Sequence, residues 1–149
     1  MMWQFEHSLI TTAKADTIWR LYSDITTWPL WDKGIESASL EGLFVQGTRG
    51  FLQPEGQDPL PFELLEVNPL HGFSDITDIP GAGIQVQFTH LLEESNGATK
   101  ITHQVKITGP NAEQIGPKFG AHMVEGIPQT MDGLARLVLE REKEQNPNE

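Results

Sequence analysis

The chain has 149 residues, no cysteine, and a formal net charge of -11 at pH 7. The length fits one domain, and the absence of cysteine excludes disulfides, thiolate catalysis and cysteine-based zinc sites. The negative charge argues against nucleic acid and anionic membrane surfaces as partners, because both repel a negative field.

The first part of the chain predicts one strand followed by two helices. Residues 3–10 alternate loosely between apolar and polar side chains, which is typical of a strand. Residues 14–23 place Ile18 and Leu21 on one face of a helix. A second short helix or turn is expected over residues 27–32, which include Trp28 and Trp31.

The middle of the chain predicts a series of strands. Glycine and proline stand at each boundary, as turns require. The expected strands are residues 35–41, 47–53, 62–67, 72–78, 84–94 and 98–108.

The last predicted strand carries a histidine on its apolar side. It alternates with period two, so His103 and Val105 share one face. Asn96-Gly97 between the last two strands is the strongest short hairpin signal. With these two as turn residues, His90 lies directly opposite His103, and their Cβ atoms are roughly 4.5–5.5 Å apart. We therefore expect two imidazoles side by side on the concave face.

The end of the chain predicts one long helix. Phe119, Met123 and Ile127 form part of an apolar stripe with helical spacing. Pro128 lies inside the pattern and should kink the helix, because it removes one backbone hydrogen bond. Residues 145–149 are expected to form a polar tail.

This order of elements predicts an α+β fold, with residues 1–144 as one domain. An antiparallel sheet with its helices on one face is consistent with this order of elements. We expect the sheet to curl around the last helix and the short helices to close one end. Four short segments together resemble the START-like superfamily, in particular polyketide cyclase/dehydrase-type proteins with a helix-grip fold. They are residues 17–24 with 28–32, residues 47–50, residues 97–103, and Gly109-Pro110 before the last helix with Ile127-Pro128 inside it.

The resemblance implies a cavity between the curled sheet and the last helix, where small apolar ligands usually bind. The superfamily includes lipid and hormone binders, aromatase/cyclases, and relatives that stimulate a heat-shock ATPase. A substrate therefore cannot be carried over from the fold.

The histidine pair has two interpretations. A neutral imidazole offers one donor and one acceptor, so His103 and His90 could bind a ligand carbonyl or hydroxyl, or His103 could act as a general acid or base. Alternatively, the two rings satisfy each other or bind water within the core. We favour a non-catalytic role, because no carboxylate is positioned beside His103 by the sequence.

Other candidate ligand contacts are apolar or aromatic. Trp28 and Trp31 could close the mouth of the cavity or pack the short helices onto the sheet. Methionine suits an adaptable pocket wall. The full candidate set comprises His103, His90, Phe88, Val105, Trp31, Trp28, Phe51, Phe119, His122, Met123 and Ile127.

Three histidines raise the possibility of a zinc site. His90, His103 and His122 plus a water would make a known catalytic shell, but the sequence has no local motif such as His-Glu-x-x-His. We expect no metal and no cofactor.

The leading hypothesis is a small-ligand binder with a mostly apolar internal cavity. The alternatives are an enzyme of the cyclase/dehydratase type and a protein-interaction regulator, so an enzymatic role stays open. The partner expected is a small apolar molecule, without nucleic acid or membrane insertion, and homodimerisation stays open. The first residues lack a basic region followed by an apolar run, so we expect no signal peptide and a cytoplasmic protein.

Overall fold

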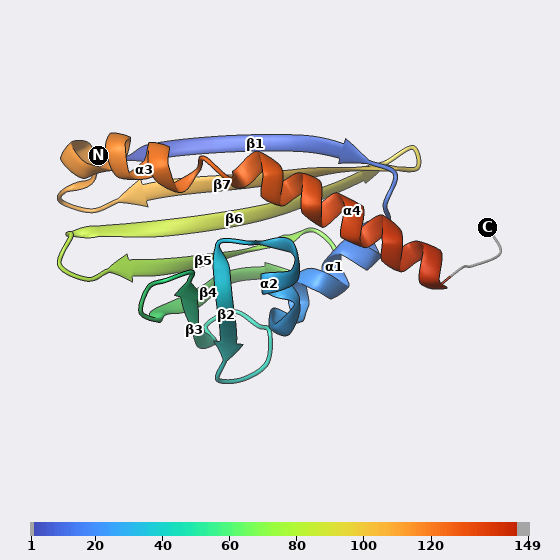
Figure 1. Cartoon of the computed structure of the whole chain (residues 1–149), viewed down its shortest axis with the longest axis horizontal. Coiled ribbons are helices and arrows are strands. Elements are labelled where there is room, and N and C mark those ends of the chain that lie inside the picture. Colours follow the sequence, from blue (N-terminus) through green and yellow to red (C-terminus); the bar gives the residue numbers. More distant parts are fainter. Residues whose placement is uncertain (1, 146–149) are drawn as a thin grey trace.

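The computed structural model describes residues 2–145. These residues form seven strands and four α-helices (Figure 1). The strands are β1 (Trp3–Thr11), β2 (Ile35–Leu40), β3 (Arg49–Pro54), β4 (Leu60–Asn68), β5 (Gly72–Ile79), β6 (Ile84–Ser95) and β7 (Ala98–Thr108). The helices are α1 (Ala15–Ser23), α2 (Trp28–Trp31), α3 (Ala112–Met123) and α4 (Ile127–Gln145), with a 3-10 turn at Ile25–Thr27 between α1 and α2.

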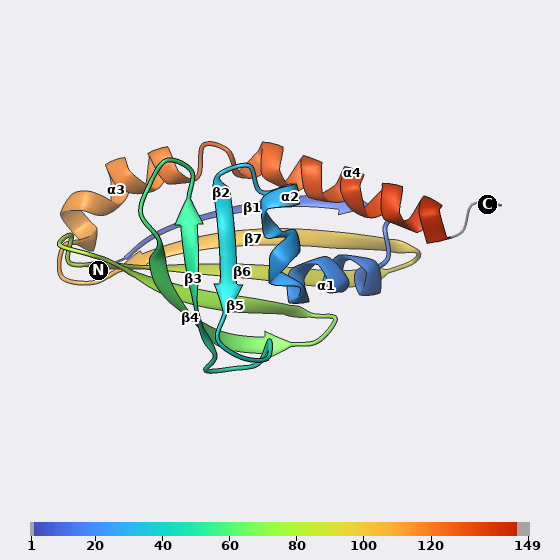
Figure 2. The ribbon, with the colours of Figure 1, turned by 60° about the horizontal axis from the view of Figure 1, so that its bottom comes forward.

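The strands form one sheet in the order β1-β7-β6-β5-β4-β3-β2, and every neighbouring pair is antiparallel. Figure 2 shows α4 running along β1 and β7, with α1 and α2 beside it. The strands β2 and β3 turn across the others, so the sheet curls (Figure 2). This architecture confirms the predicted α+β helix-grip fold.

The β6–β7 hairpin has the predicted register. Ser95 pairs with Ala98, and His90 pairs with His103. Asn96 and Gly97 have φ angles of 54° and 77°, the left-handed pair that a two-residue hairpin turn requires.

The C-terminal region differs from the single kinked helix that we expected. It divides into α3 and α4, and Pro128 lies in the first turn of α4 instead of inside a continuous helix. A proline is tolerated there, because the first amides of a helix have no intrahelical acceptor. Of the predicted tail, Gln145 is the last residue of α4, and residues 146–149 lie outside the described part.

Two apolar clusters lie between the sheet and the helices. The first joins α1, α2 and α4 to the sheet, and its members include Ile18, Tyr22, Leu64 and Met131. The second lies under α3 and is built on Val86, Val105 and Ile107. Within residues 2–145, no helix is long and apolar enough to cross a membrane.

Glycines let α3 approach the sheet closely. A Cβ atom added at Gly120 would lie 2.5 Å from the indole of Trp3, and one at Gly116 would lie 3.0 Å from its Cβ. The second cluster is thus covered by a helix that rests on the first strand.

Candidate functional site

A row of three histidines crosses the concave face of the sheet. His7 on β1 pairs with His103 on β7, which pairs with His90 on β6. The His90 and His103 rings meet edge to face, with centroids 4.5 Å apart. The adjacency of His90 and His103 was predicted from the hairpin, whereas His7 joins through a β1–β7 pairing that no turn signals in the sequence.

Tyr22 of α1 is the partner of the central histidine. Its hydroxyl oxygen lies 2.8 Å from Nε2 of His103, and both side chains are buried. Burial lowers the pKa of His103 well below its usual range, and neighbouring His90 and His7 lower it further. Burial also lowers the pKa of His90 to about 3. Both rings are therefore neutral at physiological pH.

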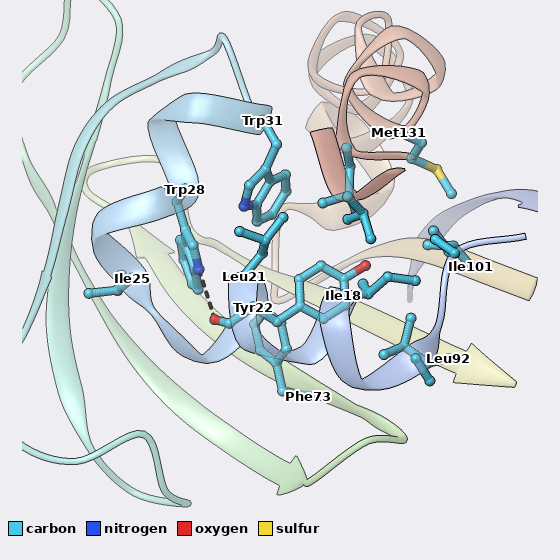
Figure 3. Packing of buried hydrophobic residues seen from close by; sticks show 14 of the residues in the cluster. Ile18, Leu21, Tyr22, Ile25, Trp28, Trp31, Phe73, Leu92, Ile101 and Met131 are labelled. Carbon is cyan, nitrogen blue, oxygen red and sulfur yellow. Dashed lines mark hydrogen bonds between the residues drawn. The ribbon is translucent and has the colours of Figure 1, made fainter. Parts of the chain in front are cut away.

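Aromatic side chains fill the interior around this row. The Phe73 ring stacks on His90 with centroids 4.2 Å apart, and Trp31 of α2 lies 6.2 Å from the His103 ring. Trp28 packs between Phe62 and Phe73, and its Nε1 donates to the carbonyl of Tyr22 at 3.0 Å (Figure 3). The end of the interior beneath α1 and α2 is thus a packed core.

Two polar atoms in this core are left without a partner. Trp31 Nε1 and His90 Nδ1 are buried and make no hydrogen bond to the described residues. The two rings adjoin, with centroids 6.4 Å apart. Buried polar groups normally bind protein or water, so these two ring nitrogens are exceptions within the packed core.

The other half of the interior contains several apolar side chains that are only partly buried. Phe88 lies in the middle of β6, between Asp75 on β5 and Val105 on β7, and both of these neighbours are buried. Phe88 is nevertheless only partly buried. Phe119, Met123 and Ile127 lie on the facing helices and are also only partly buried. Like Phe88, they pack against the second apolar cluster.

Asp75 is a polar residue of this region that does not belong to the candidate set predicted from the sequence. Its neighbours across the sheet are Phe88 and Leu64, so its side chain shares the concave face. It is 6% exposed, and burial raises its pKa to about 7. In the sequence, Phe73, Asp75 and Thr77 alternate and so share one face of a strand. The β5–β6 register is needed to show that this face is the inner one.

Two of the predicted contacts do not face this interior. Phe51 is 45% exposed and pairs with Ser39 and Pro61 on the outer side of β3. The His122 side chain is 89% exposed and lies 3.9 Å from Glu125, so it cannot join His90 and His103 around a metal ion.

Two open hollows lie elsewhere on the surface. One of about 540 Å³ lies between the start of α1 and the end of α4, beside Lys14 and Lys143. The other, of about 510 Å³, is lined by Gln4, Glu6 and Gln104 on the convex face of the sheet. Neither is bounded by a histidine of the row.

Solved structures share this architecture. Ara h 8.0201 aligns with a TM-score of 0.75 at 14% identity, over 94% of this chain and 99% of that chain. Truncated norcoclaurine synthase from Thalictrum flavum gives 0.73 at 19% identity, over 94% and 95%. Protein MLL2253 from Mesorhizobium loti gives 0.71 at 17% identity, over 93% and 98%. No protein-family model and no curated protein matches the chain.

The architecture and these alignments show that the chain has the helix-grip fold. At such identities the likeness is one of fold, and activity has to be argued from the chain's own residues.

Proposed function

We propose that the chain binds a small apolar or aromatic molecule between the Phe88 region of the sheet and the α3–α4 segment. The observation that carries this proposal is the partial exposure of Phe88 among buried neighbours at the centre of a concave face. An inward-facing side chain at that position can remain partly exposed only if space remains above it. Apolar hollows with a few polar groups are the usual form of a small-molecule site.

The facing helices support the proposal. Met123 ends α3 and Ile127 begins α4, so both lie at the break between the two helices. Helix ends at a short connection can shift more easily than a continuous helix, and methionine adapts to the shape of a ligand. Among the fold neighbours, norcoclaurine synthase has been crystallised with dopamine and hydroxybenzaldehyde, which are small aromatic molecules.

A cyclase/dehydratase-like reaction with His103 as the acid or base has less support. Nε2 of His103 is engaged by Tyr22, and Trp31 packs beside its ring. A histidine with a strongly lowered pKa is a weak base near neutral pH. The packed core beneath α1 and α2 would also fit a protein-interaction regulator, but that role gives no reason for the partial exposure of Phe88.

A fluorescence titration with N-phenyl-1-naphthylamine tests the proposal, because this neutral probe brightens in apolar sites. Phe88→Trp adds bulk to the proposed site, and Phe51→Trp makes the same change on the outer side of β3. We expect the wild type and Phe51→Trp to bind the probe equally. Overfilling costs roughly 1–3 kcal/mol, so Phe88→Trp should weaken binding by at least about fivefold.

Two results would overturn the proposal. One is the absence of saturable probe binding by the folded wild type. The other is equal weakening by both variants, which would place the probe away from Phe88.

A further inference from the structure

Asp75 is an unpartnered carboxyl beside the proposed ligand site. It lies between Leu64 and Phe88, and His90 is the next inward-facing residue after Phe88 on β6. It is 6% exposed and makes no hydrogen bond or ion pair with any residue in the 2–145 range. A buried carboxylate without a partner is costly, so a group that completes it would bind with a clear advantage.

Residues 2–145 supply no cation for this carboxyl. Every lysine and arginine side chain is exposed except that of Arg141, which is half-buried in the last two turns of α4. The nearby inward-facing groups are the neutral rings of His90 and His103 and the hydroxyl of Tyr22, and Tyr22 is already bonded to His103. A positive charge that pairs with the ionised carboxyl would therefore have to come from outside the described residues.

We propose that the ligand is a small apolar amine, whose ammonium group binds the Asp75 carboxylate while its apolar part lies against Phe88. This inference rests on the proposed function and adds the chemistry of the ligand's polar end. An ammonium donates charge-assisted hydrogen bonds, which are shorter and stronger than those of a neutral hydroxyl. A carboxylate ligand would be repelled by Asp75 and by the negative charge of the whole chain.

Three compounds with the same naphthalene body separate these chemistries. They are 1-naphthylmethylamine, 1-naphthylmethanol and 1-naphthoate, and each competes with N-phenyl-1-naphthylamine at pH 8. We expect the amine to displace the probe at a concentration at least about tenfold lower than the alcohol, and naphthoate to be the weakest.

Asp75→Asn tests the role of the carboxylate with little change in shape. It should bind the neutral probe like the wild type and lose the amine's advantage over the alcohol. Asp78→Asn is the matched control, because Asp78 is an exposed neighbour on the same strand and its change should leave the advantage intact.

Acidification provides an independent readout. Below pH 7 Asp75 takes up a proton, so the amine's advantage should shrink between pH 8 and pH 6. Five other titratable groups face or adjoin this interior: His90, His103, His7, Tyr22 and Asp32. Of these, the Asp32 carboxyl already accepts a hydrogen bond from the N–H of Gly34 at 3.0 Å. His7→Gln, which should leave the pH effect unchanged, controls for the partly buried histidine of the row.

The outcomes separate the two proposals. If the probe binds but the amine has no advantage over the alcohol, or keeps its advantage in Asp75→Asn, the amine inference is overturned and the binding site stands. If the folded wild type does not bind the probe, both fall.

Discussion

The hydroxyl of Tyr22 lies 2.8 Å from Nε2 of His103, which joins the first helix to β7 through two buried polar groups. Tyr22 belongs to α1 and His103 to β7, 81 residues apart in the sequence. The bond fixes α1 over the histidine row and holds one ring nitrogen of His103 away from any ligand. This hydrogen bond therefore marks the boundary between the packed half of the interior and the half near Phe88 that is proposed to bind the ligand.

Tyr22→Phe should destabilise the fold while keeping its aromatic packing. The change removes the hydroxyl and leaves Nε2 of His103 buried without a partner, which costs about 1–3 kcal/mol of unfolding free energy. Urea denaturation of the wild type, Tyr22→Phe, His103→Phe and the double variant measures this. A coupling energy near zero in that cycle would show that the contact contributes nothing to stability.

The buried histidines should make the protein less stable in mild acid. His90 is neutral in the fold down to a pKa of about 3, whereas the unfolded chain takes up a proton near pH 6.5. Stability from His90 is therefore fully present above pH 6.5 and is lost as the pH falls below that value. Between pH 7.5 and 5.5, the unfolding free energy of His90→Phe relative to wild type should rise by about 1 kcal/mol.

His122→Gln is the control for this pH effect, because the His122 side chain is 89% exposed. Its unfolding free energy relative to wild type should not change over the same range. A pH-independent difference between wild type and His90→Phe would contradict the burial of a neutral ring.

Asp75 should have the opposite effect on stability. Its pKa rises from 3.8 to about 7 on folding, so the folded protein binds the extra proton between these values and loses stability as the pH rises. Relative to wild type, Asp75→Asn should gain roughly 2 kcal/mol more at pH 8 than at pH 5.5. Chemical denaturation at the two pH values measures this, and a gain that is equal at both would show that Asp75 is not desolvated.

A side chain at Gly97 should destabilise the turn of the β6–β7 hairpin. Its φ of 77° is left-handed, so Gly97→Ala should cost about 1–2 kcal/mol even though nothing lies within 4 Å of the added Cβ. Gly126→Ala is the matched control, because Gly126 also has open space around its Cβ but no positive φ. Equal changes in melting temperature for the two variants would argue against the left-handed turn.

The fold could be predicted from the sequence where local signals fix geometry. Asn96-Gly97 determines the hairpin register, and that register placed His90 beside His103. Pro128 was misread because proline both breaks a helix and favours its first turn, and local periodicity does not separate these cases.

The candidate site could be predicted only in part, because it depends on pairings between distant strands. Phe51 is apolar in an alternating segment, but the pairing of β3 with β2 and β4 turns it outward. His122 lies next to an apolar stripe, and the rotation of α3 decides that it faces solvent. Asp75 needed the β5–β6 register, which no short turn signal specifies.

Methyl NMR of methionine tests the proposed position of the ligand most directly. Met123 is partly buried at the end of α3 and packs, like Phe88, against the second cluster, whereas Met131 of α4 is fully buried in the first cluster. With ¹³C-methyl methionine, addition of N-phenyl-1-naphthylamine should shift the Met123 resonance and leave that of Met131 nearly unchanged. A shift of Met131 without Met123, or of exposed Met2 alone, would contradict a ligand site between Phe88 and the break of the C-terminal helices.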